Sequence, residues 1–187
     1  DEVNAPPTSA VHKGDVWSFT TEPYGYPIPG IQADASSWAP NMGPENTING
    51  SGLVNDQHST TPEQMWMSGT NTVLPAWIQY DFGRAYKLHE LWVWNYNHSI
   101  ESFFAFGAKN VTIEYSLDGL EWTKLRDEEF ARAPGAAGYT HNAPIDMAGV
   151  MARYVRLTVT SGWGSMPQVG LSEVRFFHVP VQARQPD

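Results

Sequence analysis

Apolar and polar residues alternate along much of this chain, and a period of two residues is typical of half-buried β-strands. The segment 111–116 alternates in this way, and residues 117–119 read Leu-Asp-Gly before a second alternating segment begins at 121–125. An Asp-Gly pair between two such runs is typical of a hairpin turn. The segment 155–160 shows the same alternation. These segments therefore predict antiparallel strands with one face in a core.

Other segments carry apolar residues on both faces, as a strand buried between two layers does. The segment 77–82 ends at Gly83, the segment 88–95 contains two tryptophans, and the segment 171–176 forms a last apolar strand. No segment sustains a period of 3.6 residues, so helix should be minor. We predict an all-β fold, an antiparallel β-sandwich of the jelly-roll type. We expect four tryptophans in its core, namely Trp66, Trp77, Trp92 and Trp122.

The two ends of the chain differ in composition from the part between them. Residues 1–30 are rich in Pro, Gly and Tyr. Because proline cannot donate to a strand ladder, we expect this stretch to wrap the domain or to form short edge strands. Residues 180–187 are typical of a linker to a further domain. The sandwich itself is therefore expected over residues 31–179.

Composition and charge narrow the possible partners. The chain has 187 residues with a net charge of -9, and eleven basic residues stand among twenty acidic ones. Binding to nucleic acid or to an anionic membrane depends on clustered Lys and Arg, so we expect neither partner. The chain contains no Cys, which excludes disulfides and thiol chemistry.

Motifs for catalysis are missing from the sequence, although six His and many Ser leave a Ser-His-Asp arrangement open. There is no Gly-x-Ser-x-Gly elbow, no His-Glu-x-x-His and no phosphate-binding loop of the Walker type. The run Asp127-Glu128-Glu129 is typical of a solvated loop rather than of the paired carboxylates of a glycosidase. We therefore expect a protein that is not an enzyme.

Five sequence blocks resemble the discoidin domains, also called coagulation factor V/VIII type C domains. They occur in the order found in that family and cover roughly residues 31 to 179. The blocks are Ala35-Ser36-Ser37 with Asn46-Thr47-Ile48-Asn49-Gly50 and Trp66, then Trp77 to Gly83, Tyr115 to Trp122, Ala152 to Leu157, and Leu171 to Phe176.

The resemblance implies a galactose-binding-like jelly roll and a non-catalytic function. Bacterial members of the family are mostly carbohydrate-binding modules attached to glycoside hydrolases or polysaccharide lyases. It therefore implies a secreted or cell-surface, lectin-like module that targets a larger exported protein to a polysaccharide or glycan. Animal members bind phospholipid, collagen or cell-surface ligands, so a protein-adhesion or cell-surface-binding domain remains open, as does a structural spacer.

The resemblance also implies one structural Ca²⁺ ion, which prefers oxygen ligands. The matching positions are the backbone of Asn46, the side chain of Asn49, Ser51 and Glu173. Asn49 stands where the family usually has Asp, and the loop from Ser51 to Met65 is longer than is common. The alternative is that Asn49-Gly50 is only a tight turn and Glu173 only a surface charge.

Ligands of this family bind at loops on one end of the sandwich, and loops on a rigid scaffold commonly carry function. A flat aromatic ring can cover the apolar face of a sugar, while amide and imidazole groups bond its hydroxyls. Alternatively, the phenylalanines of the loop pack on the core and the histidine at position 58 caps its own turn. The expected ligand contacts are Trp163 for stacking, Tyr96 or Phe104 as a second ring, and the polar Asn97, His98 and His58.

Overall fold

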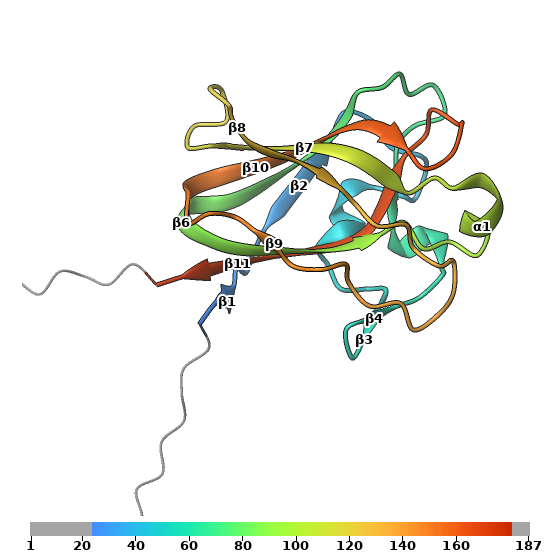
Figure 1. Cartoon of the computed structure of the whole chain (residues 1–187), viewed down its shortest axis with the longest axis horizontal. Coiled ribbons are helices and arrows are strands. Elements are labelled where there is room, and N and C mark those ends of the chain that lie inside the picture. Colours follow the sequence, from blue (N-terminus) through green and yellow to red (C-terminus); the bar gives the residue numbers. More distant parts are fainter. Residues whose placement is uncertain (1–23, 181–187) are drawn as a thin grey trace, which may run out of the picture.

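Two antiparallel layers, joined by one long strand, make up the domain (Figure 1). The computed structural model describes residues 24–180. The strands are β1 (Tyr26–Pro27), β2 (Gln32–Ala35), β3 (Leu53–Val54), β4 (Gln57–His58), β5 (Trp66–Met67), β6 (Ala76–Asn95), β7 (Ala108–Ser116), β8 (Thr123–Glu129), β9 (Ile145–Asp146), β10 (Met151–Gly162) and β11 (Gly170–Val179).

Helix is minor, as the sequence predicts. Within residues 24–180 it consists of the one-turn helix α1 (Glu101–Phe104) and two 3₁₀ turns, η1 (Pro44–Thr47) and η2 (Pro62–Gln64). No helix in this part of the chain has the length and apolar character needed to cross a membrane. The all-β prediction is confirmed, and the hairpin predicted around residues 117–119 joins β7 to β8.

Strand β6 belongs to both layers. Its first half pairs with β2 and β10, and β10 continues the layer through β7 to β8. Its second half pairs with β11 and β9, and β11 also pairs with β1 and β5. The halves meet near Gly83, whose φ of 74° is a conformation that glycine adopts without strain. The two strands predicted at 77–82 and 88–95 are therefore the two halves of one bent strand.

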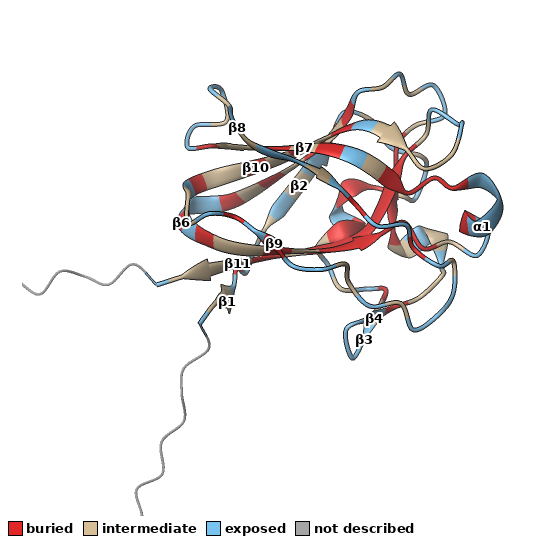
Figure 2. Ribbon diagram, in the orientation of Figure 1, coloured by how far each residue is buried: buried red, intermediate tan, exposed pale blue. Residues whose placement is uncertain are grey.

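Side chains that point between the layers form the main core. Along the first half of β6, buried residues alternate with partly exposed ones, and Figure 2 shows the same alternation on the neighbouring strands. Removal of this apolar surface from water is the main force that holds the layers together. Residues buried at this interface include Ile78, Tyr80, Ile113, Val155, Leu157 and Phe176.

The tryptophans only partly follow their prediction. Trp66 is fully buried, and its ring N–H donates to the Ser37 carbonyl. Trp77 and Trp122 are instead half-buried, with the Arg156 guanidinium 5.2 Å and 3.9 Å from their ring centroids. Trp77 precedes the inward Ile78, so a period of two residues turns it outward. Trp92 is half-buried for the same reason, because Leu91 and Val93 are the buried residues around it.

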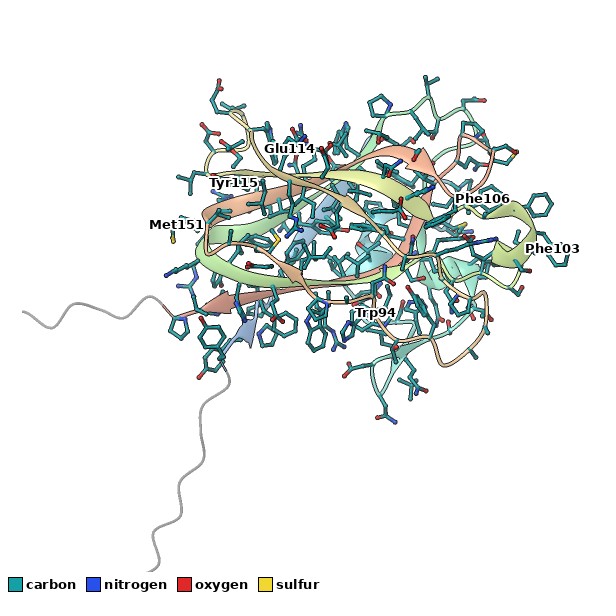
Figure 3. All side chains as sticks on the ribbon, in the orientation of Figure 1. Trp94, Phe103, Phe106, Glu114, Tyr115 and Met151 are labelled. Atoms are coloured by element: carbon teal, nitrogen blue, oxygen red, sulfur yellow. The ribbon has the colours of Figure 1, made fainter. Side chains whose placement is uncertain are left out.

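A second, smaller core lies beneath the loops at one pole of the sandwich. Met65, Met67, Tyr96 and Phe106 pack together there. Ala39 and Met42 pack against them from a different loop. Loops that are far apart in the sequence thus share one apolar support. We call the pole that carries these loops and α1 the loop end; Figure 3 shows Phe103 projecting from it.

The described ends of the chain lie at the opposite pole (Figure 1). Tyr26 of β1 pairs with His178 of β11, which places the two ends side by side. The short strand β1 contains Pro27 and lies at a sheet edge, where proline is tolerated. Residues 24–30 contain this edge strand, whereas the rest of the segment 1–30 is not described, so its wrapping role stays a prediction. Residues 1–23 and most of the expected linker 180–187 lie outside the described residues.

Candidate functional site

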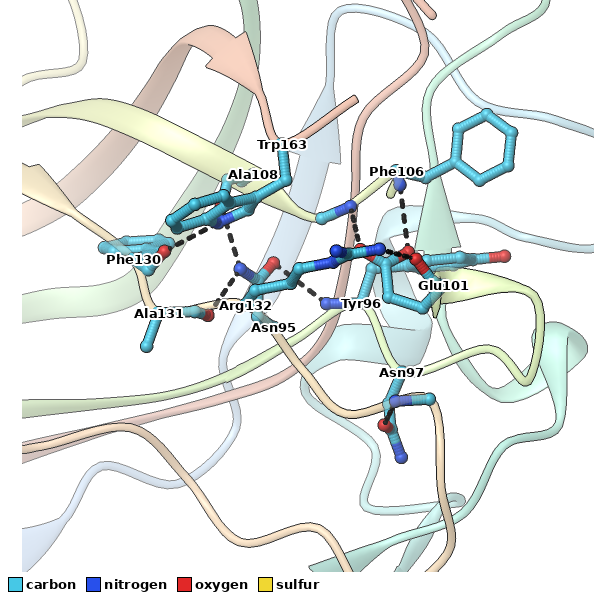
Figure 4. Close-up of polar contacts among 12 residues, drawn as sticks. Asn95, Tyr96, Asn97, Glu101, Phe106, Ala108, Phe130, Ala131, Arg132 and Trp163 are labelled. Carbon is cyan, nitrogen blue, oxygen red and sulfur yellow. Dashed lines mark hydrogen bonds and ion pairs between the residues drawn. The ribbon is translucent and has the colours of Figure 1, made fainter. Parts of the chain in front are cut away.

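Loops 96–107 and 161–169 meet at the loop end, with Trp163 between them. Its backbone N–H donates to the Gly107 carbonyl at 3.0 Å. Its ring N–H donates to the Phe130 carbonyl at 2.9 Å (Figure 4). The Lys109 ammonium lies 4.5 Å from the ring centroid. Trp163 is therefore half-buried, with its N–H and one approach to its ring already used by the protein.

Asn97 has a structural role that the sequence did not indicate. The side chain is fully buried, its amide donates to the carbonyls of Ser59 and Ala136, and its oxygen accepts the N–H of Gly135. Every strong hydrogen-bonding group of the side chain is thus occupied inside the protein. The structure corrects the expectation that Asn97 contacts a ligand, because no part of the side chain reaches the surface.

Two further expected ligand contacts are also buried. Tyr96 is 2% exposed and packs in the small core edge-to-face with Phe106, and its burial raises the pKa of the phenol. His58 is fully buried; its Nδ1 pairs with the Ser59 carbonyl at 3.0 Å, and its Nε2 has no partner among residues 24–180. Burial lowers the pKa of this imidazole. Both expectations are corrected, and His58 holds its own loop, which is the alternative role given above.

His98 and Phe104 remain accessible at the loop end. His98 is half-buried, and its Nδ1 accepts the N–H of Ile100 at 3.1 Å. Phe104 is 51% exposed, although its ring stacks on Phe106 with the centroids 5.9 Å apart. Of the six expected ligand contacts, three side chains can therefore reach a ligand: Trp163, His98 and Phe104.

A buried carboxylate fixes the tip of this loop. Glu101 is fully buried and accepts the backbone N–H groups of Phe106 and Gly107, each at 2.9 Å. Arg132 donates to the Glu101 carbonyl, and its Nε lies 3.8 Å from the carboxylate (Figure 4). Burial raises the pKa of Glu101, while the two N–H groups and Arg132 oppose the change. The sequence carries no motif that would have identified this support.

An open groove on the loop end was also missed by the sequence analysis. It has a volume of about 430 Å³ and lies between the loops 36–40 and 69–75. Trp38 is 52% exposed there, and its ring N–H makes no hydrogen bond with any residue from 24 to 180. The groove belongs to the loop end because the Ser68 N–H, just before one wall, donates to the Val169 carbonyl. The other lining residues include Ser36, Ser37, Thr70, Asn71, Thr72, Val73 and Pro75.

The four residues expected to hold calcium come together at one place. The Gly50 N–H donates to the Glu173 carboxylate at 3.3 Å, and Asn49 and Glu173 line the same hollow of about 270 Å³. The Asn49 side-chain oxygen accepts the Ser51 N–H, and its amide lies 3.4 Å from the Asn46 side-chain oxygen. No group of three or more His, Cys, Asp or Glu side chains suited to a metal occurs within residues 24–180.

The chemistry of this cluster fits a hard cation such as Ca²⁺. It offers a carboxylate, an amide oxygen, a hydroxyl and a backbone carbonyl, which are the oxygen ligands that calcium prefers. Glu173 is only 2% exposed, so it is not a surface charge. Burial raises its pKa to about 7, against smaller opposing effects of the Gly50 N–H and Arg175. A buried carboxylate with so little positive charge near it is a suitable ligand for a cation.

The two layers, the shared strand β6 and the loop end define a galactose-binding-like β-sandwich. The family model of the F5/8 type C domain matches residues 32–173. The chain therefore belongs to the F5/8 type C domain family, as the five sequence blocks imply. No curated protein sequence matches the chain.

Several solved structures share the fold. CBM32-3 from a family 31 glycoside hydrolase of Clostridium perfringens is 22% identical with a TM-score of 0.63, and the match covers 83% of this chain and 95% of that module. The family 32 carbohydrate-binding module of C. perfringens NanJ, in complex with galactose, is 15% identical with a TM-score of 0.62; coverage is 82% and 99%. Both are carbohydrate-binding modules, a non-catalytic class.

A third similar structure is a glycoside hydrolase that is much longer than this chain. It is the C. perfringens family 89 glycoside hydrolase in complex with its substrate GlcNAc-α-1,4-galactose, with 18% identity and a TM-score of 0.60. The match covers 87% of this chain but only 16% of the enzyme. At these identities the likeness shows a common fold.

Proposed function

We propose that this domain is a non-catalytic carbohydrate-binding module that targets a larger exported protein to a polysaccharide or glycan outside the cell. One observation carries the proposal: the loop end presents an exposed aromatic ring, Trp38, beside hydroxyl and amide side chains. A ring covers the apolar face of a sugar, and these polar groups bond its hydroxyls. The sugar complex of the NanJ module and the multidomain family 89 hydrolase support both parts of the proposal.

The supports of the loop end favour a binding site over a mobile surface. Glu101 and Asn97 hold their loops through buried hydrogen bonds, and the small core supports the loop that carries Trp38. A ligand site of this kind loses little conformational entropy when the ligand binds. His98, Phe104 and Trp163 lie on the same loop end and are proposed as peripheral contacts to a longer glycan.

We assign a structural Ca²⁺ ion to Asn46, Asn49, Ser51 and Glu173. The ion would supply positive charge beside the buried carboxylate and tie the loop at residues 49–51 to β11. Because Asn49 and Glu173 line a hollow shared with Pro27 to Ile31, bound calcium would stabilise the fold rather than contact the glycan.

The test of the function is retention of the purified domain in native gels that contain polysaccharides, combined with a glycan array. We expect retention in at least one polysaccharide. A control variant, Leu120→Ser, changes a side chain that is 81% exposed on the β7–β8 hairpin, away from the loop end, and should bind like the unmodified domain. A folded domain that binds no glycan on the array and no polysaccharide in the gels would overturn the proposal.

A protein-adhesion function is the second candidate, and one feature favours it. Ile100, Phe103 and Phe104 are 37%, 84% and 51% exposed on or beside the single turn of α1. Exposed apolar clusters commonly mark protein-binding surfaces. Under this alternative Phe103→Ser would abolish binding to a cell surface stripped of its glycans. Under the carbohydrate proposal it would leave glycan binding nearly unchanged.

A further inference from the structure

We infer that the groove between loops 36–40 and 69–75 is the glycan site, that Trp38 is its stacking platform, and that its ligand is an uncharged sugar. This inference rests on the proposed function and adds the place and the chemical class of the ligand. It moves the principal ring contact from Trp163 to Trp38.

The platform is accessible and held in place. The Trp38 side chain is 52% exposed. The Trp163 side chain is less exposed, and its ring N–H is bonded to the Phe130 carbonyl. The next residue, Ala39, donates its backbone N–H to the Met67 carbonyl at 2.8 Å and packs on the small core. The indole of Trp38 therefore projects from a fixed backbone, and its N–H, which has no partner among residues 24–180, can bond a sugar hydroxyl.

The two walls of the groove are joined to each other. The hydroxyls of Ser37 and Thr72 lie 3.0 Å apart, and the Ser37 hydroxyl also accepts the Gly69 N–H at 3.1 Å. Thr72 in turn donates to the Gly69 carbonyl at 2.7 Å. These bonds fix the spacing between the walls before any ligand binds, which reduces the ordering cost of binding.

Some polar groups of the groove remain free for a ligand. The side chains of Thr70 and Asn71 are exposed, and neither makes a hydrogen bond with another residue from 24 to 180. Thr70 supplies a hydroxyl, and Asn71 supplies a donor and an acceptor on one planar group. Together with the Trp38 ring they form the combination of one flat face and several hydrogen-bonding groups that a pyranose requires.

The ligand class follows from what the groove lacks. Among residues 24–180, none of those that line the groove is charged. A carboxylate or sulfate on the ligand would lose water there without meeting a cation, which is unfavourable. The net charge of -9 adds a long-range repulsion of polyanions. The exposed Val73 and the ring of Pro75 add apolar surface, which suits the C–H faces of a neutral sugar.

The test uses gels that contain neutral polysaccharides (a galactan and a glucan) or acidic ones (alginate, polygalacturonate and chondroitin sulfate), with isothermal titration on fragments of any polymer that retains the domain. We expect retention by a neutral polymer and at least a tenfold weaker affinity for Trp38→Ala, since an anchoring ring commonly contributes more than about 1.4 kcal/mol. Raising the salt from about 0.05 M to about 0.5 M should not change the affinity, because no ion pair is involved.

The matched control is Phe103→Ala, which removes another exposed ring from the same end of the domain and should leave the affinity unchanged. Retention only by acidic polymers, lost at high salt, would overturn the ligand class and leave the proposed function in place. Neutral binding that survives Trp38→Ala would overturn the groove as its site. Binding to no polymer would overturn the proposed function itself.

Discussion

The loop end contains two regions that use their polar and aromatic residues in opposite ways. In the segment 95–101 the side chains of Asn95, Asn97 and Glu101 point inward and bond to backbone groups of the protein. In the groove the polar side chains of Thr70 and Asn71 are exposed, and the Trp38 ring lies beside them. The first region holds the loops in position, and the second presents its polar and aromatic side chains to a ligand.

The difference shows that the type of a residue does not determine its role at a loop end. The asparagine side chain both donates and accepts hydrogen bonds, so it can bond a sugar hydroxyl and an unpaired backbone peptide group equally well. A long connection that is not a strand leaves many peptide groups to satisfy, and buried amides such as Asn97 satisfy them. Substitutions of the buried polar residues should therefore lower the stability of the domain, whereas substitutions in the groove should lower its affinity for a ligand.

The largest effect on stability is expected for Asn97→Ala. The change leaves two carbonyls and the Gly135 N–H without their partner in a buried place, so the free energy of unfolding should fall by about 3 kcal/mol. Urea denaturation followed by circular dichroism measures this loss. The matched variant is Asn71→Ala on the exposed side, which should change stability by less than about 0.5 kcal/mol. Equal stabilities of the two variants would remove the distinction between the regions.

Calcium should have the next largest effect, through Glu173. Excess Ca²⁺, at about 100 times its Kd, should raise the free energy of unfolding by about 2.7 kcal/mol. Without calcium, a pKa raised to about 7 means that the folded state holds a proton that the unfolded state releases near pH 4.5. As the pH rises from 4.5 to 7, the contribution of Glu173 to the free energy of unfolding therefore falls. Calcium should stabilise the domain more at pH 8 than at pH 5.5.

Melting curves with calcium and with a chelator measure the effect. Glu173→Gln should abolish the response, whereas Glu63→Gln, an exposed carboxylate in the neighbouring 3₁₀ turn η2, should keep it. The same melting temperature with calcium and with chelator at pH 8 would contradict the assignment of the site.

His58 should make stability fall at acid pH. Burial lowers the pKa of its imidazole in the folded state, so the unfolded chain takes up the proton first as the pH falls through about 6.5. The contribution of His58 to the free energy of unfolding should therefore decrease from pH 7 to pH 5, by less than the effect of calcium and in the direction opposite to the contribution of Glu173 in the calcium-free domain. The loss should be smaller in His58→Gln than in the unmodified domain. A variant with the same pH dependence would show that the pKa of His58 is the same in the folded and unfolded states.

The smallest effect on stability is expected at the exposed rings. Trp38→Ala and Phe103→Ala remove side chains that are 52% and 84% exposed, so each should change the free energy of unfolding by less than about 0.5 kcal/mol. Since Trp38→Ala is also expected to weaken glycan binding, it separates binding from folding. A large loss of stability in this variant would place Trp38 with the supporting residues instead.

The strands were predictable because one physical rule determines them. A sheet with one buried face demands an alternating sequence, and residues 111–116 and 155–160 show it clearly. Trp77 and Trp92 were misplaced because their position within strands was taken as evidence for burial, although the alternation assigns them to the outer faces. Their neighbours Ile78 and Val93 hold the inward positions, so these rings lie on the outer faces. Arg156 covers the Trp77 ring and makes its exposure less costly.

The site was less predictable, because loop positions follow no period. Trp163, which stands between Gly162 and Gly164, was expected to stack on a ligand. Gly164 is required for a different reason: a Cβ there would lie 2.1 Å from the Phe104 carbonyl oxygen. The glycine thus allows two loops to meet and does not mark a ligand. Trp38 follows a pair of serines and precedes Ala39-Pro40, and only the folded contact with the 69–75 loop turns this stretch into a groove.

The pairing of Tyr26 with His178 has a practical consequence for anyone who handles this domain. The ends of the described part of the chain, residues 24 and 180, lie together at the pole farthest from α1 (Figure 1). A fluorescent protein, a resin or a neighbouring module joined directly at residue 24 or 180 would therefore lie at the pole opposite the loop end and leave Trp38 facing outward. Immobilisation at residues 24 and 180 should present all molecules in the same orientation, with the loop end facing away from the support.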